Sequence, residues 1–172
     1  QIEPHLSVTG GCSAEWIPIR PKTDGAFLHA MIHVLAHETP REKLDLPFLK
    51  DKTASPYLVG PNGFFMRDLA TRKPLMWDHK RGCAVPFDTP EADPALEGEF
   101  KISGIEVGAD GETWEHTDRL CRTAFGKLLE HEQTNTPEWA AGICDVPAKT
   151  IRRIANEFLE HAKIGATIDV EG

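Results

Sequence analysis

Residues 17–38, "IPIRPKTDGAFLHAMIHVLAHE", constrain the fold most, because a short extended run turns there through one proline into a periodic helix. The apolar residues after Asp24 recur at the spacing of one helix face: Phe27, Leu28, Met31, Ile32, Val34 and Leu35. Thr39 and Pro40 predict the end of the helix, which we place at His37. A strand that turns directly into a helix is typical of an α/β fold.

The junction itself offers a binding site as well as a helix start. The first backbone N–H groups of a helix have no partners within it, and they attract anions and nucleotides. Thr23 or Asp24 can serve as an ordinary N-cap, and Gly25 lets another group approach closely. Glu3, in "IEPHLS", has two readings: an acid at the end of a strand that binds ribose hydroxyls, or an exposed strand-end acid.

The remaining chain shows alternating strand and helix signals. Asn62 and Gly63 predict a hairpin, because both residues tolerate positive φ. Residues 78–116 have no helical period and are rich in Gly, Pro and acids. We further expect a strand ending near Glu3, a loop at 9–11, a strand at 15–19, helices at 40–51, 117–132 and 147–161 (with residues 151, 154, 155, 158 and 159 buried), a short strand at 100–107, and a last strand within 164–170.

Composition excludes several classes of protein. In a chain of 172 residues, 40% are hydrophobic and 27% charged, which is the balance of a globular protein. The net charge of −8 argues against nucleic acid as a partner, and no apolar run is long enough to insert directly into a membrane. The four cysteines, which form no CxxC pair, predict free thiols rather than a zinc or iron–sulfur site: Cys12, Cys83, Cys121 and Cys144. The cellular compartment stays open.

His29, His33 and His37 recur every four residues, on the side of the helix opposite Phe27 and Met31. Histidines at this spacing can share a metal ion. No cysteine or carboxylate pattern in the sequence completes a metal shell, so we expect a solvated or subunit-facing polar stripe and assign no metal ligand and no catalytic residue. A metal-dependent hydrolase built on these histidines is the least favoured alternative.

Three stretches together resemble the molybdopterin oxidoreductases of the dimethyl sulfoxide reductase family. They are "IEPHLSVTGGCSAEWIPIRPKTDGAFLHAMIHVLAHE", "PYLVGPNGFFMRD" followed by "KPLMWD", and "TPEWAAGICDVPAKTIRRIANEF". The family pattern is an acid–proline pair after a strand, then a Pro-Gly-Thr-Asp turn that opens a helix. The resemblance covers most of the chain, and its combination of motifs is specific although each piece alone is weak.

The resemblance implies an α/β fold that is part of a Rossmann-like dinucleotide-binding domain with a β-hairpin and a long irregular insertion. Residues 1–172 would be a single segment of that domain: a cofactor-contacting βα unit at 1–38, the hairpin and insertion at 53–116, and a helical part leading to a strand at 117–172. The cofactor implied is a bis-molybdopterin guanine dinucleotide carrying molybdenum or tungsten. Its contacts carry over to two sets, Glu3, His5 and Ser7, and Lys22, Thr23 and Asp24.

Two positions depart from the family pattern. Lys22 stands where the family usually has glycine, and His5 stands where it usually has arginine. The cysteines that bind a 4Fe-4S cluster in the family, and the residue that binds the metal, are not in this sequence, so we expect them in a missing N-terminal part and in other missing segments.

The chain then reads as an inactive fragment of a catalytic subunit. Its partners would be the rest of that same subunit, together with an iron–sulfur electron-transfer subunit. The enzyme would act on a small substrate, and the resemblance lies nearest to reductases of sulfur compounds. The alternative is a non-catalytic α/β module that binds a nucleotide or a protein.

Overall fold

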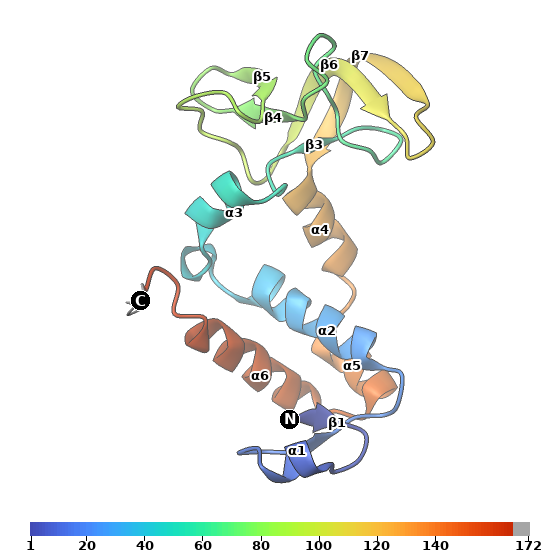
Figure 1. Ribbon diagram of the computed structural model, residues 1–172, viewed down its shortest axis with the longest axis vertical. Helices are drawn as coiled ribbons and strands as arrows, with labels where there is room; N and C mark the ends of the chain where they lie inside the picture. Colours follow the sequence, from blue (N-terminus) through green and yellow to red (C-terminus); the bar gives the residue numbers. More distant parts are fainter. Residues whose placement is uncertain (167–172) are drawn as a thin grey trace. The chain divides into compact units, whose positions relative to one another are not determined.

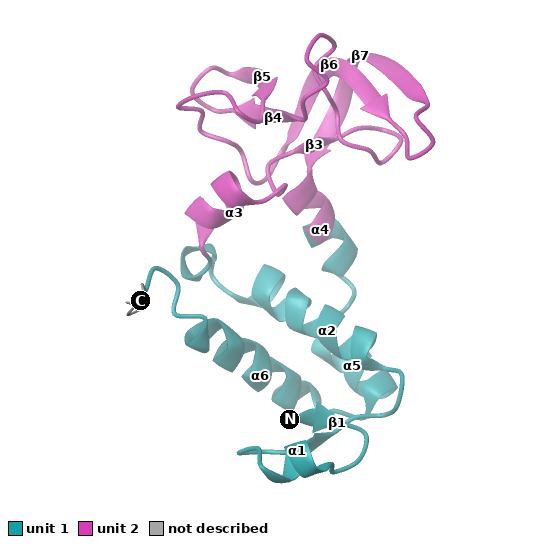
Figure 2. Ribbon diagram, in the orientation of Figure 1, with its two compact units in different colours: residues 1–44, 129–172 teal, residues 45–128 magenta. Residues whose placement is uncertain are grey.

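The computed structural model describes residues 1–166 and shows a mixed α/β structure (Figure 1). The chain forms two compact units (Figure 2). Unit 1 contains residues 1–44 together with the chain from Leu129 onward, and unit 2 contains Asp45–Leu128. The expected α/β class is confirmed. That the whole chain is a segment of one dinucleotide-binding domain stays a prediction.

Unit 1 combines a small parallel sheet with helices. β1 and β2 pair in parallel, with Ile2 opposite Ile17 and Glu3 opposite Pro18. The elements of this unit are β1 (Ile2–Glu3), α1 (Val8–Gly11), β2 (Ile17–Pro18), α2 (Asp24–His33), the π-helical turn η1 (Val34–Glu38), the 3-10 turn η2 (Arg41–Lys43), α5 (Pro137–Cys144) and α6 (Ala148–His161). Helix α4 (Ala124–Glu132) begins in unit 2 and ends in unit 1. The strands near Glu3 and at 15–19 and the helix after Asp24 are confirmed, whereas the expected loop at 9–11 is the helical turn α1.

The core of unit 1 lies where α2, α5 and α6 pack on one another and on β2. Its buried residues are Ile17, Ile19, Phe27, Ala30, Ala140, Cys144, Val146 and Ile151. Phe27 and Val34 are buried as expected, but Leu28 is exposed. In α6, Ile151 and Ala155 are buried as expected, but Phe158 is exposed. The periodicity therefore located both helices correctly and placed the edges of their buried faces less well.

Unit 2 is built around an antiparallel sheet with the strand order β3-β7-β6, beside the separate hairpin β4-β5. Its elements are α3 (Leu46–Lys52), β3 (Leu58–Val59), β4 (Leu75–Asp78), β5 (Cys83–Pro86), β6 (Glu99–Val107) and β7 (Thr113–Thr123). Its core is formed by Leu58, Met66, Leu75, Ile102 and Cys121. The expected hairpin around Asn62 is confirmed: Val59 bridges Phe65, and Gly63 has φ +86°.

Three expectations about secondary structure are wrong in part. Residues 117–123 are not helical but belong to β7, because they pair with β6, and a cross-strand ladder outweighs the weak local helix signal. The short strand expected at 100–107 is confirmed as β6, but the stretch 78–116 is less irregular than expected, since it also contains β5 and the start of β7. The helix expected at 40–51 begins only at Leu46, where the Asp45 carboxylate accepts a hydrogen bond from the N–H of Phe48.

The remaining comparisons with the sequence concern helix α5, the cysteines, the last expected strand and membrane-spanning helices. Helix α5 was not expected, although Thr136 caps it and Pro137 opens it. All four cysteines are free thiols, as predicted. The last strand, expected within 164–170, falls largely outside the described residues. Among the helices of residues 1–166, none is both long and apolar enough to cross a membrane.

Candidate functional site

The first candidate site is the edge of unit 1 at which β1 and β2 end. Because the two strands are parallel and Glu3 lies opposite Pro18, the loops that follow them leave the sheet at the same edge. In α/β structures ligands bind at the carboxyl ends of parallel strands. Glu3 is the last residue of β1, His5 and Ser7 belong to the loop that follows it, and the turn at 22–24 belongs to the second loop. The structure therefore brings the two predicted contact sets to one edge.

The first loop is held by its own acid. The backbone N–H of Ser7 donates to Glu3 Oε1 at 2.9 Å, and Ser7 Oγ lies 2.8 and 2.9 Å from the two carboxylate oxygens. These hydrogen bonds, the backbone one first, lower the pKa of Glu3. A Cβ at residue 10 would lie 2.2 Å from Glu3 Oε1, so Gly10 is required there. His5 is exposed. Glu3 and Ser7 therefore shape the loop before any ligand is bound.

The second loop contains a residue in the left-handed region. Lys22 has φ +66°, a conformation that glycine adopts without cost, which explains why related turns place glycine there. Thr23 occupies the N-cap position of α2, but its Oγ1 donates to the carbonyl oxygen of Arg20 at 2.6 Å. The expected helix cap by the Thr23 side chain is therefore wrong. Arg20 in turn makes a bidentate ion pair with Asp145, in which Nε and Nη2 lie 2.9 and 2.8 Å from the two carboxylate oxygens. This ion pair connects the turn to the end of α5.

The start of α2 is open to a ligand. Within residues 1–166, the N–H groups of Asp24 and Gly25 find no hydrogen-bond acceptor, and the Asp24 carboxylate makes no hydrogen bond or ion pair. A Cβ built on Gly25 would meet no atom within 4 Å. Two free donors and one free carboxylate therefore face open space at the edge where the strands end. This arrangement can bind a group that offers both acceptors and donors.

The second candidate site is formed by His29, His33 and His37, which contact the end of α4. His29 Nδ1 lies 2.9 Å from Glu132 Oε1, while His33 Nδ1 and His37 Nε2 bind the backbone carbonyls of Glu132 and Leu129. His33 is buried, so it is not solvated, and the alternative that the stripe faces another subunit stays a prediction. Glu132 lies 103 positions from His29, and because no local pattern links the two, the sequence gives no signal for this contact.

Comparison with known proteins shows that the chain is similar to part of several large oxidoreductase subunits. It is 32% identical to a sulfite dehydrogenase subunit of Allochromatium vinosum over 91% of the chain and 16% of that protein. It is 32% identical to the alpha subunit of the perchlorate reductase of Dechloromonas aromatica (84% and 18%), and 31% identical to the dimethyl sulfoxide reductase DmsA of Haemophilus influenzae (91% and 13%). The chain thus spans less than a fifth of each of these relatives. No family model matches it.

Proposed function

The chain is a homologue of part of the catalytic subunits of molybdopterin oxidoreductases of the dimethyl sulfoxide reductase family, and we propose from this premise that it docks the guanine end of their dinucleotide cofactor. The observation that carries the proposal is the open start of α2, where Asp24 and Gly25 offer an unpaired carboxylate and two unpaired N–H groups. A carboxylate accepts two parallel hydrogen bonds from the ring N–H and the exocyclic amine of guanine.

The other predicted residues support this docking in different ways. Lys22 and His5 would supply donors for phosphate oxygens. Glu3 and Ser7 hold the first loop in place through their mutual hydrogen bonds, and the carboxylate retains lone pairs for a ribose hydroxyl. Thr23 fixes the turn by binding Arg20. The parallel pairing of β1 and β2 supports a Rossmann-like domain, whose further strands would come from segments of the whole protein outside the described residues.

The activity of the whole protein is part of the proposal. It would carry a bis-molybdopterin guanine dinucleotide with molybdenum or tungsten, and this group would supply the electron or oxygen-atom transfer when bound. A 4Fe-4S cluster elsewhere in the same protein, together with an iron–sulfur partner subunit, would pass the electrons, in keeping with relatives that are named as subunits of larger complexes. The names of the relatives favour a small oxidised or reduced sulfur or chlorine compound as substrate.

Substitution of Asp24 tests the docking role. We expect Asp24→Asn to weaken cofactor retention by about 10- to 150-fold, because the amide offers one acceptor oxygen and turns an NH₂ toward the guanine donors, a loss of about 1.5–3 kcal/mol. Helix stability should change little, since Asn is accepted at helix starts nearly as well as Asp. The measurement is the guanine dinucleotide and molybdenum content per purified subunit.

Asp45→Asn is the matched control, because Asp45 also stands at a helix start but uses its carboxylate to cap α3. It should retain the cofactor at the level of the unchanged protein. Equal cofactor content in the Asp24→Asn and Asp45→Asn proteins would reduce Asp24 to an ordinary helix-start residue and overturn the proposal.

A further inference from the structure

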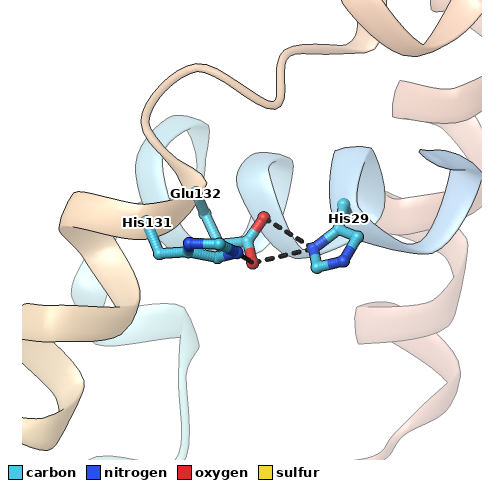
Figure 3. Close-up of side chains that lie close together, drawn as sticks. All are labelled: His29, His131 and Glu132. Carbon is cyan, nitrogen blue, oxygen red and sulfur yellow. Dashed lines mark hydrogen bonds and ion pairs between the residues drawn. The ribbon is translucent and has the colours of Figure 1, made fainter. Parts of the chain in front are cut away.

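His29, His131 and Glu132 gather at one point of unit 1. Figure 3 shows His29 extending from α2 toward the last turn of α4, which carries the other two side chains. One ligand atom from each residue lies within 4.8 Å of the others. Two imidazole nitrogens and one carboxylate oxygen form a donor set that zinc sites use, with the fourth position left to water.

The carboxylate of this cluster is buried and held in place by hydrogen bonds. The Glu132 side chain is 1% exposed, and it accepts hydrogen bonds from His29 Nδ1 and from Asn135 Nδ2, the latter at 3.0 Å. Asn135 also fixes the orientation of the carboxylate, which is the part that outer residues play around metal ligands.

The spacing of the three groups suits a small cation. Bonds of about 2.0–2.1 Å in a tetrahedral arrangement place the ligand atoms about 3.3 Å apart. The distances from Glu132 Oε1 to His29 Nδ1 and to His131 Nε2, 2.9 and 3.9 Å, lie on either side of that value. His131 is 68% exposed, so its ring can rotate toward the other two ligands without disturbing the core. A cation would take the place of the proton that His29 now shares with Glu132.

Two further histidines hold α2 and η1 against the end of α4 beside the cluster. His33 Nδ1 binds the carbonyl of Glu132 at 2.7 Å, and His37 Nε2 binds that of Leu129 at 2.9 Å. These contacts fix the end of α4 against α2 and η1, so His29 and Glu132 stay within reach of each other whether or not a cation is bound. Metal binding then costs little rearrangement of the backbone.

We propose that His29, His131 and Glu132 bind one divalent cation of the zinc class. Imidazole ligands select Zn²⁺ and its transition-metal neighbours over Mg²⁺ and Ca²⁺, which take oxygen ligands. The three protein ligands leave one position for water, and the exposure of His131 gives the ion an entry path. The site does not depend on the molybdopterin cofactor or on Asp24.

Titration with Zn²⁺ alone tests the site in the purified subunit that contains the chain, once adventitious metal has been removed. We expect calorimetry to give one Zn²⁺ per chain, and zinc X-ray absorption to show two imidazole ligands. His131→Ala should weaken zinc binding at least about tenfold, and folding should be preserved because this side chain is exposed. His161→Ala, which removes an exposed histidine at the end of α6, is the matched control and should bind zinc like the unchanged protein.

Glu132→Gln is a second variant, and it should also bind zinc more weakly, because the amide is a poor ligand. Failure of the unchanged protein to bind Zn²⁺ at micromolar concentration would overturn the site and leave a histidine–glutamate ion pair. Equal zinc affinity of the His131→Ala and His161→Ala proteins would also overturn it. Neither result bears on cofactor retention by Asp24, which is measured separately.

Discussion

The two units use their buried carboxylates differently. In unit 2, Asp78 accepts the backbone N–H groups of Lys80 and Asp93, both at 3.0 Å. Glu106 accepts those of Asn62 and Phe64 at about 3 Å. In unit 1, Glu132 accepts hydrogen bonds only from side chains among the described residues. Both carboxylates of unit 2 therefore fix backbone N–H groups, although Asp78 also binds Arg81, whereas Glu132 of unit 1 binds side chains alone among the described residues.

The difference follows from the secondary structure around each acid. Helices satisfy most of their own backbone groups, so a buried acid at the end of a helix in unit 1 remains available to side chains. The turns of unit 2 leave N–H groups without partners, and a buried carboxylate supplies the acceptors they need. Gly60 shows how tight this fit is, since a Cβ there would lie 2.4 Å from the carboxyl carbon of Glu106. The Glu132 carboxylate of unit 1 is therefore available for function, whereas the Asp78 and Glu106 carboxylates of unit 2 maintain the fold.

The largest expected effect of a substitution is at Glu106. Glu106→Ala would leave the backbone N–H groups of Asn62 and Phe64 without their acceptor. It would also remove the partner of His116, whose Nε2 lies 2.6 Å from Glu106 Oε2 in an ion-pair contact outside hydrogen-bond geometry. We expect the free energy of unfolding of unit 2 to fall by about 3–5 kcal/mol. Denaturant unfolding measures this loss, and a value below about 1 kcal/mol would contradict the structural role of Glu106.

A smaller effect is expected at Glu132 in unit 1. Glu132→Ala removes the acceptor of His29 and Asn135, but the His29 ring is 43% exposed and can turn to water. We expect a loss of about 1–2 kcal/mol in the free energy of unfolding, measured with a chelator present so that metal binding does not contribute. If the free energy of unfolding fell as much as in Glu106→Ala, Glu132 would be as important to the fold as Glu106, and the proposed difference between the two acids would be wrong.

The last prediction concerns the acid sensitivity of unit 2. The hydrogen bond from Arg81, followed by that from the N–H of Asp93, lowers the pKa of Asp78 from 3.8 to about 2. The unfolded chain therefore takes up a proton at a higher pH than the folded one. The stabilisation by Asp78 is complete above about pH 4 and is lost as the pH falls toward 2. Denaturant midpoints of the unchanged protein should fall more steeply across this interval than those of Asp78→Asn, and parallel curves would contradict the prediction.

Local patterns predicted much of unit 1 and little of unit 2. The periodicity after Asp24 and that before His161 located α2 and α6, because a buried helix face repeats within a few residues. The strand β7 was mistaken for helix over residues 117–123, since its residues gain their stability from β6 across the sheet rather than from their neighbours in sequence. The short helix α5 was missed for lack of a long periodic run.

The sequence by itself determined the junction at Lys22, Thr23 and Asp24, the likeness to the molybdopterin oxidoreductases and the free state of the four cysteines. These features depend on residue types at adjacent or fixed positions. Only the tertiary structure decided that Thr23 binds Arg20 instead of capping α2, that Asp24 is unpaired among the described residues, and that His29 meets Glu132. The reason is physical: a side chain of this kind bonds to whichever partner folding brings within about 3 Å, and for His29 that partner is 103 residues away.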